Sequence, residues 1–390
     1  MERLFRFLSM WVSVLLVGSC IYDYTPPVPE GEARLVVNGD ILIGEMTEIR
    51  ISRTTEIGSE LAGTIAVDAV YVEGSDGSVF KGSQKEDSTY EIDTRNAPDN
   101  AEYRLVIETK GRTYESDWQS VLIASAIDSI SYSIAEDAQT MAIEVSSSAN
   151  AGSDNRFYRW IARQTWEYHA ASRPVEYYVP PGGMTYEGEV SPSGGIYSYP
   201  YQADDNYFCW MSAEVSDLLL GSTLNLNENK FIRHVLYTLE CHEPRTQYLY
   251  SVQLIQEAIP ETAWRYYEAV RSNSFNVGGL FSPQPSEVRG NLHNRAVPEE
   301  WIIGYVCVTK PSVLRHFIYM DEIGFHRINR DWDLVTDTKV SEKNWLLYWK
   351  TGYLVSHVED DGVYWAPRRC LDCRTRGGTK DKPSWWPNDH

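Results

Sequence analysis

The sequence predicts a mainly β protein, in which an N-terminal immunoglobulin-like or transthyretin-like β-sandwich precedes a larger β-rich domain with one or two short helices. Short runs of alternating apolar and polar residues follow one another from Arg34 to about Ser120, and this period is typical of strands with one buried face. Turn signals separate the runs, as at residues 75–77 (SDG) and 110–111 (KG). Aromatic residues are abundant, with 13 Trp and 26 Tyr, and strands favour them.

The first nineteen residues have the three zones of a signal peptide. Arg3 and Arg6 supply positive charge, residues 7–17 are apolar, and a small pair, Gly-Ser, follows. The apolar run is too short for a transmembrane helix, which needs about 20 apolar residues. Because Cys20 comes directly after the small pair, we expect a lipoprotein anchored to the membrane by a lipid on Cys20, with simple secretion as the alternative. Residues 20–32, which contain three prolines, form the lipidated N-terminus and tether.

The mature chain is strongly acidic. Removal of residues 1–19 takes two of the 35 basic and one of the 55 acidic side chains, which leaves 33 and 54 and a formal charge of −21. Such a surface repels polyphosphates, so we expect no nucleic-acid partner. The length allows two or three domains. We expect a β-sandwich domain over residues 33–125 and a β-rich second domain over residues 126–390, which ends in a cysteine-containing tail.

Strands are expected in the second domain at residues 141–147, 156–169, 301–308 and 313–320. Residues 260–273 (PETAWRYYEAVRSN) have the clearest helix pattern, with a proline in the first turn and apolar residues on one face. A second, shorter helix is expected at residues 212–220. Residues 276–294 are dense in Gly, Pro and Asn and predict a rigid loop that supports its neighbours.

Residues 174–200 are rich in Gly, Pro, Ser and Tyr and are long for a structureless connection. We interpret them as a binding loop or a crossing segment, with a mobile surface insertion as the alternative. Tyrosine rings stack on sugars or peptides, and their hydroxyls form hydrogen bonds at the rim of a site. We therefore expect a carbohydrate or peptide ligand, or a protein partner, to contact this loop; the alternative is that its tyrosines pack on the second domain. The candidate contact residues are Tyr177, Tyr178, Tyr186, Tyr197, Tyr199, Tyr201 and Tyr207.

Five cysteines remain besides the lipidated one, so at least one is unpaired. Cys370 and Cys373 form a CxxC motif, but neither a second pair of zinc ligands nor the βαβ context of a redox site accompanies it. We therefore predict no metal and a structural disulfide between Cys370 and Cys373, with other pairings as the alternative. Cys209 and Cys241 are a candidate second bridge. Cys307, within IIGYVCV, is the predicted buried free thiol.

The sequence lacks the GxSxG nucleophile elbow, the Walker loop, the HExxH motif and the Rossmann glycine pattern. We therefore expect no catalytic residues and no cofactor. His234 and His242 lie in the apolar segment HVLYTLECHE, which favours structural histidines over metal ligands.

Several segments occur in an order that resembles a known family. RYYEAVRSN, GGLFSPQPSEVRGNLHN, EEWIIGYVCV, LRHFIY and CLDCRTRGGTKDKPSWW follow one another, after RLVVNGDI and TEIRISRT near the N-terminus. This pattern resembles the family catalogued as domain of unknown function 4249. The resemblance implies a lipoprotein of Bacteroidota-type bacteria, commonly encoded beside a TonB-dependent outer-membrane receptor, and it implies no catalytic residue.

Together these inferences predict a non-catalytic outer-membrane lipoprotein that acts as a binding or assembly partner of a TonB-dependent receptor in nutrient uptake. A structural or adhesive envelope protein is the alternative, and a secreted hydrolase is the third interpretation.

Overall fold

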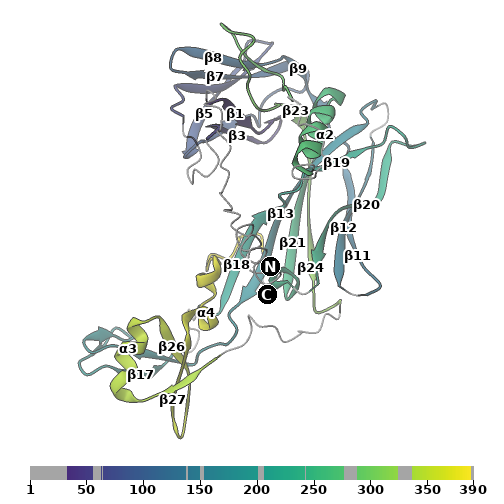
Figure 1. Cartoon of the computed structure of the whole chain (residues 1–390). Coiled ribbons are helices and arrows are strands. Elements are labelled where there is room, and N and C mark those ends of the chain that lie inside the picture. Colours follow the sequence, from purple (N-terminus) through teal and green to yellow (C-terminus); the bar gives the residue numbers. More distant parts are fainter. Residues whose placement is uncertain are drawn as a thin grey trace, which may run out of the picture.

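The computed structural model describes residues 33–55, 63, 65–137, 139–149, 153–200, 206–241, 243–275, 288–323 and 336–387. Within them the chain is mainly β, with several antiparallel sheets and a few short helices, which confirms the predicted fold class. Figure 1 shows three parts in succession: an N-terminal sandwich, a central sandwich and a distal module that carries α3, β17, β26 and β27. Among the described residues, no helix is long and apolar enough to cross a membrane. Cys20 lies outside these ranges.

The N-terminal sandwich is a continuous antiparallel sheet that folds over one core. Its strand order is β1-β3-β6-β5-β4-β7-β8-β22, and β9 also pairs with β7. Strands from both halves of this order contribute to the same core, for example Ile49, Val72 and Leu105. The two predicted turns join β4 to β5 and β7 to β8. The bounds are β1 (Leu35–Asn38), β3 (Met46–Arg53), β4 (Ala69–Gly74), β5 (Val79–Glu86), β6 (Thr89–Asp93), β7 (Glu102–Thr109), β8 (Arg112–Ser116), β9 (Gln119–Ser120) and β22 (Leu292–Asn294).

Residues 292–310 return to this sandwich from far along the chain. β22 pairs with β8, and β23 (Val308–Lys310) lies parallel to and between β2 (Ile41–Leu42) and β10 (Leu122–Ile123). The predicted strand at 301–308 is wrong over residues 301–307, where the only ladder contact is a single bridge at Ile303. Ile302 and Val306 pack into the N-terminal core, while Tyr305 and Cys307 pack with residues of α2. The proposed domain boundary at residue 125 stays a prediction, and this core also draws on residues after it.

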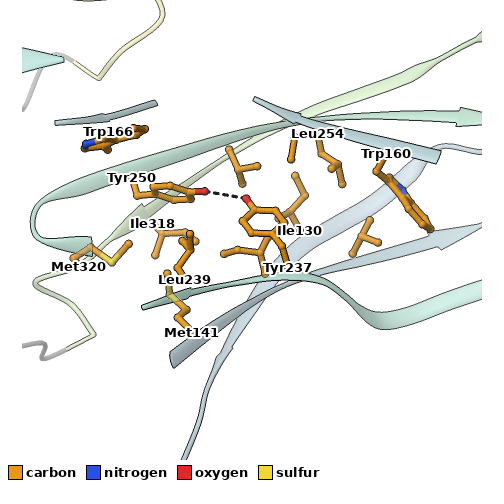
Figure 2. Packing of buried hydrophobic residues seen from close by; sticks show 14 of the residues in the cluster. Ile130, Met141, Trp160, Trp166, Tyr237, Leu239, Tyr250, Leu254, Ile318 and Met320 are labelled. Carbon is orange, nitrogen blue, oxygen red and sulfur yellow. Dashed lines mark hydrogen bonds between the residues drawn. The ribbon is translucent and has the colours of Figure 1, made fainter. Parts of the chain in front are cut away.

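The central sandwich packs two antiparallel sheets face to face. One has the order β11-β12-β20, and the other has the order β18-β13-β21-β24, with β19 also on β13. Figure 2 shows Tyr237 from the first sheet and Tyr250 from the second meeting in the shared core, where their hydroxyls form a 2.9 Å hydrogen bond. The bounds are β11 (Ile127–Ile134), β12 (Thr140–Ser148), β13 (Phe157–His169), β18 (Phe208–Glu214), β19 (Leu219–Ser222), β20 (Lys230–Glu240), β21 (Leu249–Ala258) and β24 (Ser312–Tyr319).

The remaining strand and helix predictions can be compared directly. β12, β13 and β24 confirm the strands predicted at 141–147, 156–169 and 313–320, and α2 (Glu261–Phe275) confirms the main helix. The helix predicted at 212–220 is wrong. Both β18 and β19 pair with the same long strand β13 there, at its C-terminal and N-terminal halves respectively. Hydrogen bonding to a distant edge therefore overrides the local helical pattern.

A buried ionic cluster joins the two sandwiches. Arg159 of β13 pairs with Asp40 of the N-terminal sandwich and donates from Nε to Glu257 Oε2 of β21 at 2.8 Å. Its Nη1 donates to the hydroxyl of Tyr267 on α2 at 2.6 Å, and the backbone N–H of Cys307 donates to Asp40. The guanidinium of Arg159 therefore forms ion pairs with two buried carboxylates, those of Asp40 and Glu257. Burial, reinforced by Asp40, raises the pKa of Glu257 to about 7 even though Arg159 opposes the shift.

The distal module contains small sheets and short helices. The predicted loop at 174–200 folds as two hairpins, in which β14 (Glu176–Val179) pairs with β17 (Gly195–Ser198) and β15 (Gly183–Met184) pairs with β16 (Val190–Ser191). A three-stranded sheet of order β25-β27-β26 lies beside β14. The other bounds are β25 (Thr338–Val340), β26 (Tyr353–Glu359), β27 (Gly362–Pro367), α3 (Trp345–Lys350), α4 (Arg368–Leu371), η1 (Pro244–Thr246), η2 (Glu342–Asn344) and η3 (Cys373–Arg376).

Candidate functional site

Three of the predicted tyrosines form a mutual cluster in the distal module. The ring of Tyr177, on β14, lies 4.9 Å from that of Tyr186 and 4.8 Å from that of Tyr199, and the last two are 5.2 Å apart. The Tyr177 hydroxyl also accepts a 2.9 Å hydrogen bond from the backbone N–H of Tyr186. Tyr186 nevertheless remains 50% exposed. The three rings are therefore fixed by one another while one of them still faces solvent.

Tyr178 follows Tyr177 on the same strand and makes different contacts, because successive strand residues point to opposite faces. Its ring lies 5.5 Å from Trp365 of β27 and 6.4 Å from Trp349 of α3. Burial raises the pKa of the Tyr178 hydroxyl. This residue therefore fastens the hairpin to the three-stranded sheet.

A cavity of about 450 Å³ lies between the hairpin and the C-terminal segment. Its volume falls within the range of about 300–1,000 Å³ usual for small-molecule sites. The lining residues are Pro174, Glu176, Tyr177, Tyr178, Tyr186, Tyr199, Asn206, Trp349, Leu354, Val355, Arg368 and Arg374. Four of the seven predicted tyrosines thus meet around one hollow. Most of the other lining side chains come from a part of the chain more than 140 residues further on.

The charged side of the cavity is organised by Asp372, whose side chain is 3% exposed. Arg374 binds it through two hydrogen bonds, Nε to Oδ1 at 2.9 Å and Nη2 to Oδ2 at 2.8 Å. Arg368 is held more loosely, with Nε 3.5 Å from Oδ2. Burial alone would raise the pKa of Asp372, but the hydrogen bonds from Arg374 outweigh it, and the pKa is lowered. Asp372 therefore stays ionised and positions two guanidinium groups at the cavity.

The other predicted contact tyrosines lie elsewhere. Tyr197 does not line the cavity; its ring lies 5.9 Å from Tyr177 and its hydroxyl donates to Ser191 Oγ at 2.7 Å. Tyr207 packs on His169 and Phe208 of the central sandwich, as the alternative for these tyrosines predicted. Tyr201 lies outside the described residues.

The disulfide prediction needs correction. Cys373 is bonded to Cys209 of β18, not to Cys370, and their Cα atoms are 5.8 Å apart, within the usual range of about 4.4–6.8 Å. The chain turns at Asp372, so that Cys370 packs with Leu371 beneath the distal sheet while the next cysteine faces the central sandwich. The candidate Cys209–Cys241 bridge is also wrong, because Cys209 is bonded to Cys373.

The observed disulfide ties the C-terminal segment to the central sandwich across 164 residues. A backbone pairing between Trp210 and Thr379 lies close by. Cys307 is fully buried with its thiol free, which confirms its predicted state.

Sequence reasoning missed the C-terminal wall of the cavity, namely Trp349, Arg368 and Arg374. The last two flank Asp372 within the block around the CxxC motif, for which the sequence predicted only a cysteine-containing tail with a structural disulfide. The alternation of Arg, Asp and Arg near that motif is the one signal that could have suggested a charged site. Among the described residues, no group of three or more His, Cys, Asp or Glu side chains is placed to hold a metal ion.

A family model described as a domain of unknown function, DUF4249, matches residues 21–315. The matched range includes the tyrosine wall of the cavity and ends before Trp349 and the two arginines. A search of curated proteins finds no match.

Proposed function

Because the chain belongs to the DUF4249 family, whose description names no activity, we propose a function from the site itself: a non-catalytic outer-membrane lipoprotein that captures a small ligand for a partner TonB-dependent receptor. The observation that carries this proposal is the cavity of about 450 Å³, which combines fixed tyrosine rings with positioned guanidinium groups. Among the described lining residues Glu176 is the one carboxylate, and serine, cysteine and histidine are absent, so neither a nucleophile with its base nor the carboxylate pair of a glycosidase lines the cavity. This composition favours binding over catalysis.

The arrangement of the three parts supports capture at a distance from the membrane. The predicted lipid on Cys20 and the tether of residues 20–32 precede β1, which belongs to the N-terminal sandwich. The cavity is lined by residues of the distal module, and this module lies at the opposite end of the molecule from the N-terminal sandwich (Figure 1). A ligand held there is presented away from the anchored end. A receptor that imports nutrients is the partner that would take up a ligand captured at such a site.

The partnership is tested by affinity purification of the tagged lipoprotein from detergent-solubilised outer membrane. We expect a TonB-dependent barrel to co-purify in stoichiometric amount. Recovery of surface fibres or matrix components without a barrel would contradict the proposal and support the structural or adhesive alternative. The Cys20→Ala form, added to the same membranes, separates docking of the protein body from co-localisation through the lipid.

The capture site is tested with Tyr186→Ala and Tyr199→Ala in the same background. Both variants should retain the receptor and lose bound ligand, measured by native mass spectrometry after incubation with pooled oligosaccharides and tryptic peptides. Leu347→Ala is the matched control, because Leu347 is 59% exposed on α3 of the same module and does not line the cavity. Ligand retention equal to that of the control would contradict this site.

A further inference from the structure

The two arginines of the cavity differ in how fully they are occupied. Arg374 is engaged by Asp372 through two hydrogen bonds on one side of its guanidinium. Arg368 has a 55% exposed side chain, and in the described part of the chain its only side-chain interaction is the 3.5 Å ion pair from Nε. Its two terminal nitrogens are therefore available for a ligand. A planar guanidinium offers paired donors that match a carboxylate.

The tyrosines of the cavity offer a different kind of contact. The rings of Tyr177, Tyr186 and Tyr199 fix one another and give the cavity a rigid aromatic lining. Such a surface suits a sugar ring, which has apolar C–H faces and polar edges. Glu176 and Asn206 also line the cavity and can accept or donate hydrogen bonds at the hydroxyl groups of a sugar.

The balance of charge limits the ligand to few negative groups. Asp372 is already shared between the two arginines, and Glu176 adds a further carboxylate to the lining. The chain as a whole carries a formal charge of −20 and repels polyanions at long range. The guanidinium of Arg368, which has available donors, therefore matches a ligand with one carboxylate.

Building on the proposed function, we infer that the cavity binds an acidic saccharide, with a uronic-acid carboxylate on Arg368 and the sugar ring on the tyrosine wall. A peptide that presents an aliphatic anchor fits less well, because most of the lining side chains end in a polar group. Arg368 is then the residue that selects acidic over neutral sugars. The tyrosines bind both kinds.

The test compares each acidic oligosaccharide with its own methyl ester, which keeps the ring and removes the charge. The probes are oligomers of galacturonate, glucuronate and mannuronate, titrated calorimetrically into the mature chain that carries Cys20→Ala. We expect at least one acid to bind about tenfold or more tightly than its ester, the scale of one charge-assisted hydrogen-bonded contact. Arg368→Gln should lower the affinity for that acid to the level of the ester and leave the ester unchanged.

Arg369→Gln is the matched control, because Arg369 is the exposed neighbour on α4, carries the same charge and does not line the cavity. This control should bind like the wild type. Equal binding of acid and ester, an equal effect of Arg368→Gln on both, or no binding of any probe would overturn the inference. If acid and ester bind equally and Tyr186→Ala abolishes the binding of both, the cavity is a site for neutral sugars and the proposed function stands. Failure of the receptor to co-purify bears on the proposed function alone.

Discussion

Replacing Glu257 by Gln should remove a pH-dependent contribution from the stability of the chain. Glu257 is fully buried and shares Arg159 with Asp40, and among the described residues its Oε1 has no hydrogen-bond partner. Burial raises its pKa from 4.5 to about 7. The carboxyl therefore takes up a proton in the folded chain at a pH where the unfolded chain has already lost it.

The sign and size follow from this difference in proton binding. Below about pH 4.5 the carboxyl is neutral in both states, and its full contribution to stability is present. As the pH rises towards 7, only the unfolded state gains by ionising, so the free energy of unfolding falls. At ~1.4 kcal/mol for each pKa unit, the loss amounts to about 3 kcal/mol. Gln keeps an oxygen that can accept from Arg159 and has no proton to lose.

The assay is urea unfolding at pH 5, 6, 7 and 8, followed by tryptophan fluorescence on the mature chain with Cys20→Ala. The free energy of unfolding of Glu257→Gln, relative to the parent, should increase by about 2.5 kcal/mol between pH 5 and pH 8, because the unfolded carboxyl is already partly ionised at pH 5. Glu187→Gln is the control, because Glu187 is exposed in the distal module, and its difference from the parent should stay constant. Parallel pH profiles for Glu257→Gln and the parent would show that Arg159 keeps Glu257 ionised throughout, and would refute the reasoning.

Three further predictions concern the anchor, the disulfide and the Gly-rich segment. Cys20→Ala should abolish metabolic labelling by a fatty-acid analogue and partition of the protein with membranes; persistent label would contradict the lipid anchor. Differential alkylation with mass spectrometry should find Cys209 and Cys373 oxidised in protein from the envelope, and ready alkylation of either in the native protein without a reductant would exclude the disulfide. Gly290→Val should lower the melting temperature sharply, because a Cβ at Gly290 would lie 1.6 Å from the carbonyl oxygen of Gly304, and a clash of this kind costs on the order of 3 kcal/mol or more. Normal melting with loss of binding alone would instead make this segment part of the functional site.

Local sequence patterns predicted much of the fold. The hairpin of β7 and β8 was predictable because the Lys110-Gly111 turn signal lies between two alternating runs. The helix α2 was predictable because its proline, its acidic first turn and its apolar face all lie within 15 residues. The same reasoning failed at residues 212–220, where two short strands pair one after the other with the same edge of β13. Such pairing depends on a distant strand that leaves no trace in the local period.

One part of the candidate site was also predictable from the local sequence, and the other part was not. The density of tyrosines after residue 174 marked one wall of the cavity, because stacking surfaces are a matter of composition. The other wall, with Trp349 and Arg368, was not predictable, since nothing near these residues indicates that Trp349 packs on Tyr178 or that Arg368 lines the same cavity. Asp372 illustrates the difficulty. Its role in positioning two arginines depends on its burial, which sequence spacing does not reveal.

By itself, therefore, the sequence determined the mainly β class, the main helix and the aromatic character of one surface, because each depends on residues close together in the chain. Only the tertiary structure decided that residues 292–310 complete the N-terminal core, that Cys373 meets Cys209, and that Arg368 lines the same cavity as the tyrosines. These contacts join segments separated by more than 150 residues. The free energy of these contacts comes from burial and pairing of groups that meet only after the chain has folded. A given local sequence pattern is therefore compatible with many partner segments, and tertiary packing selects one of them.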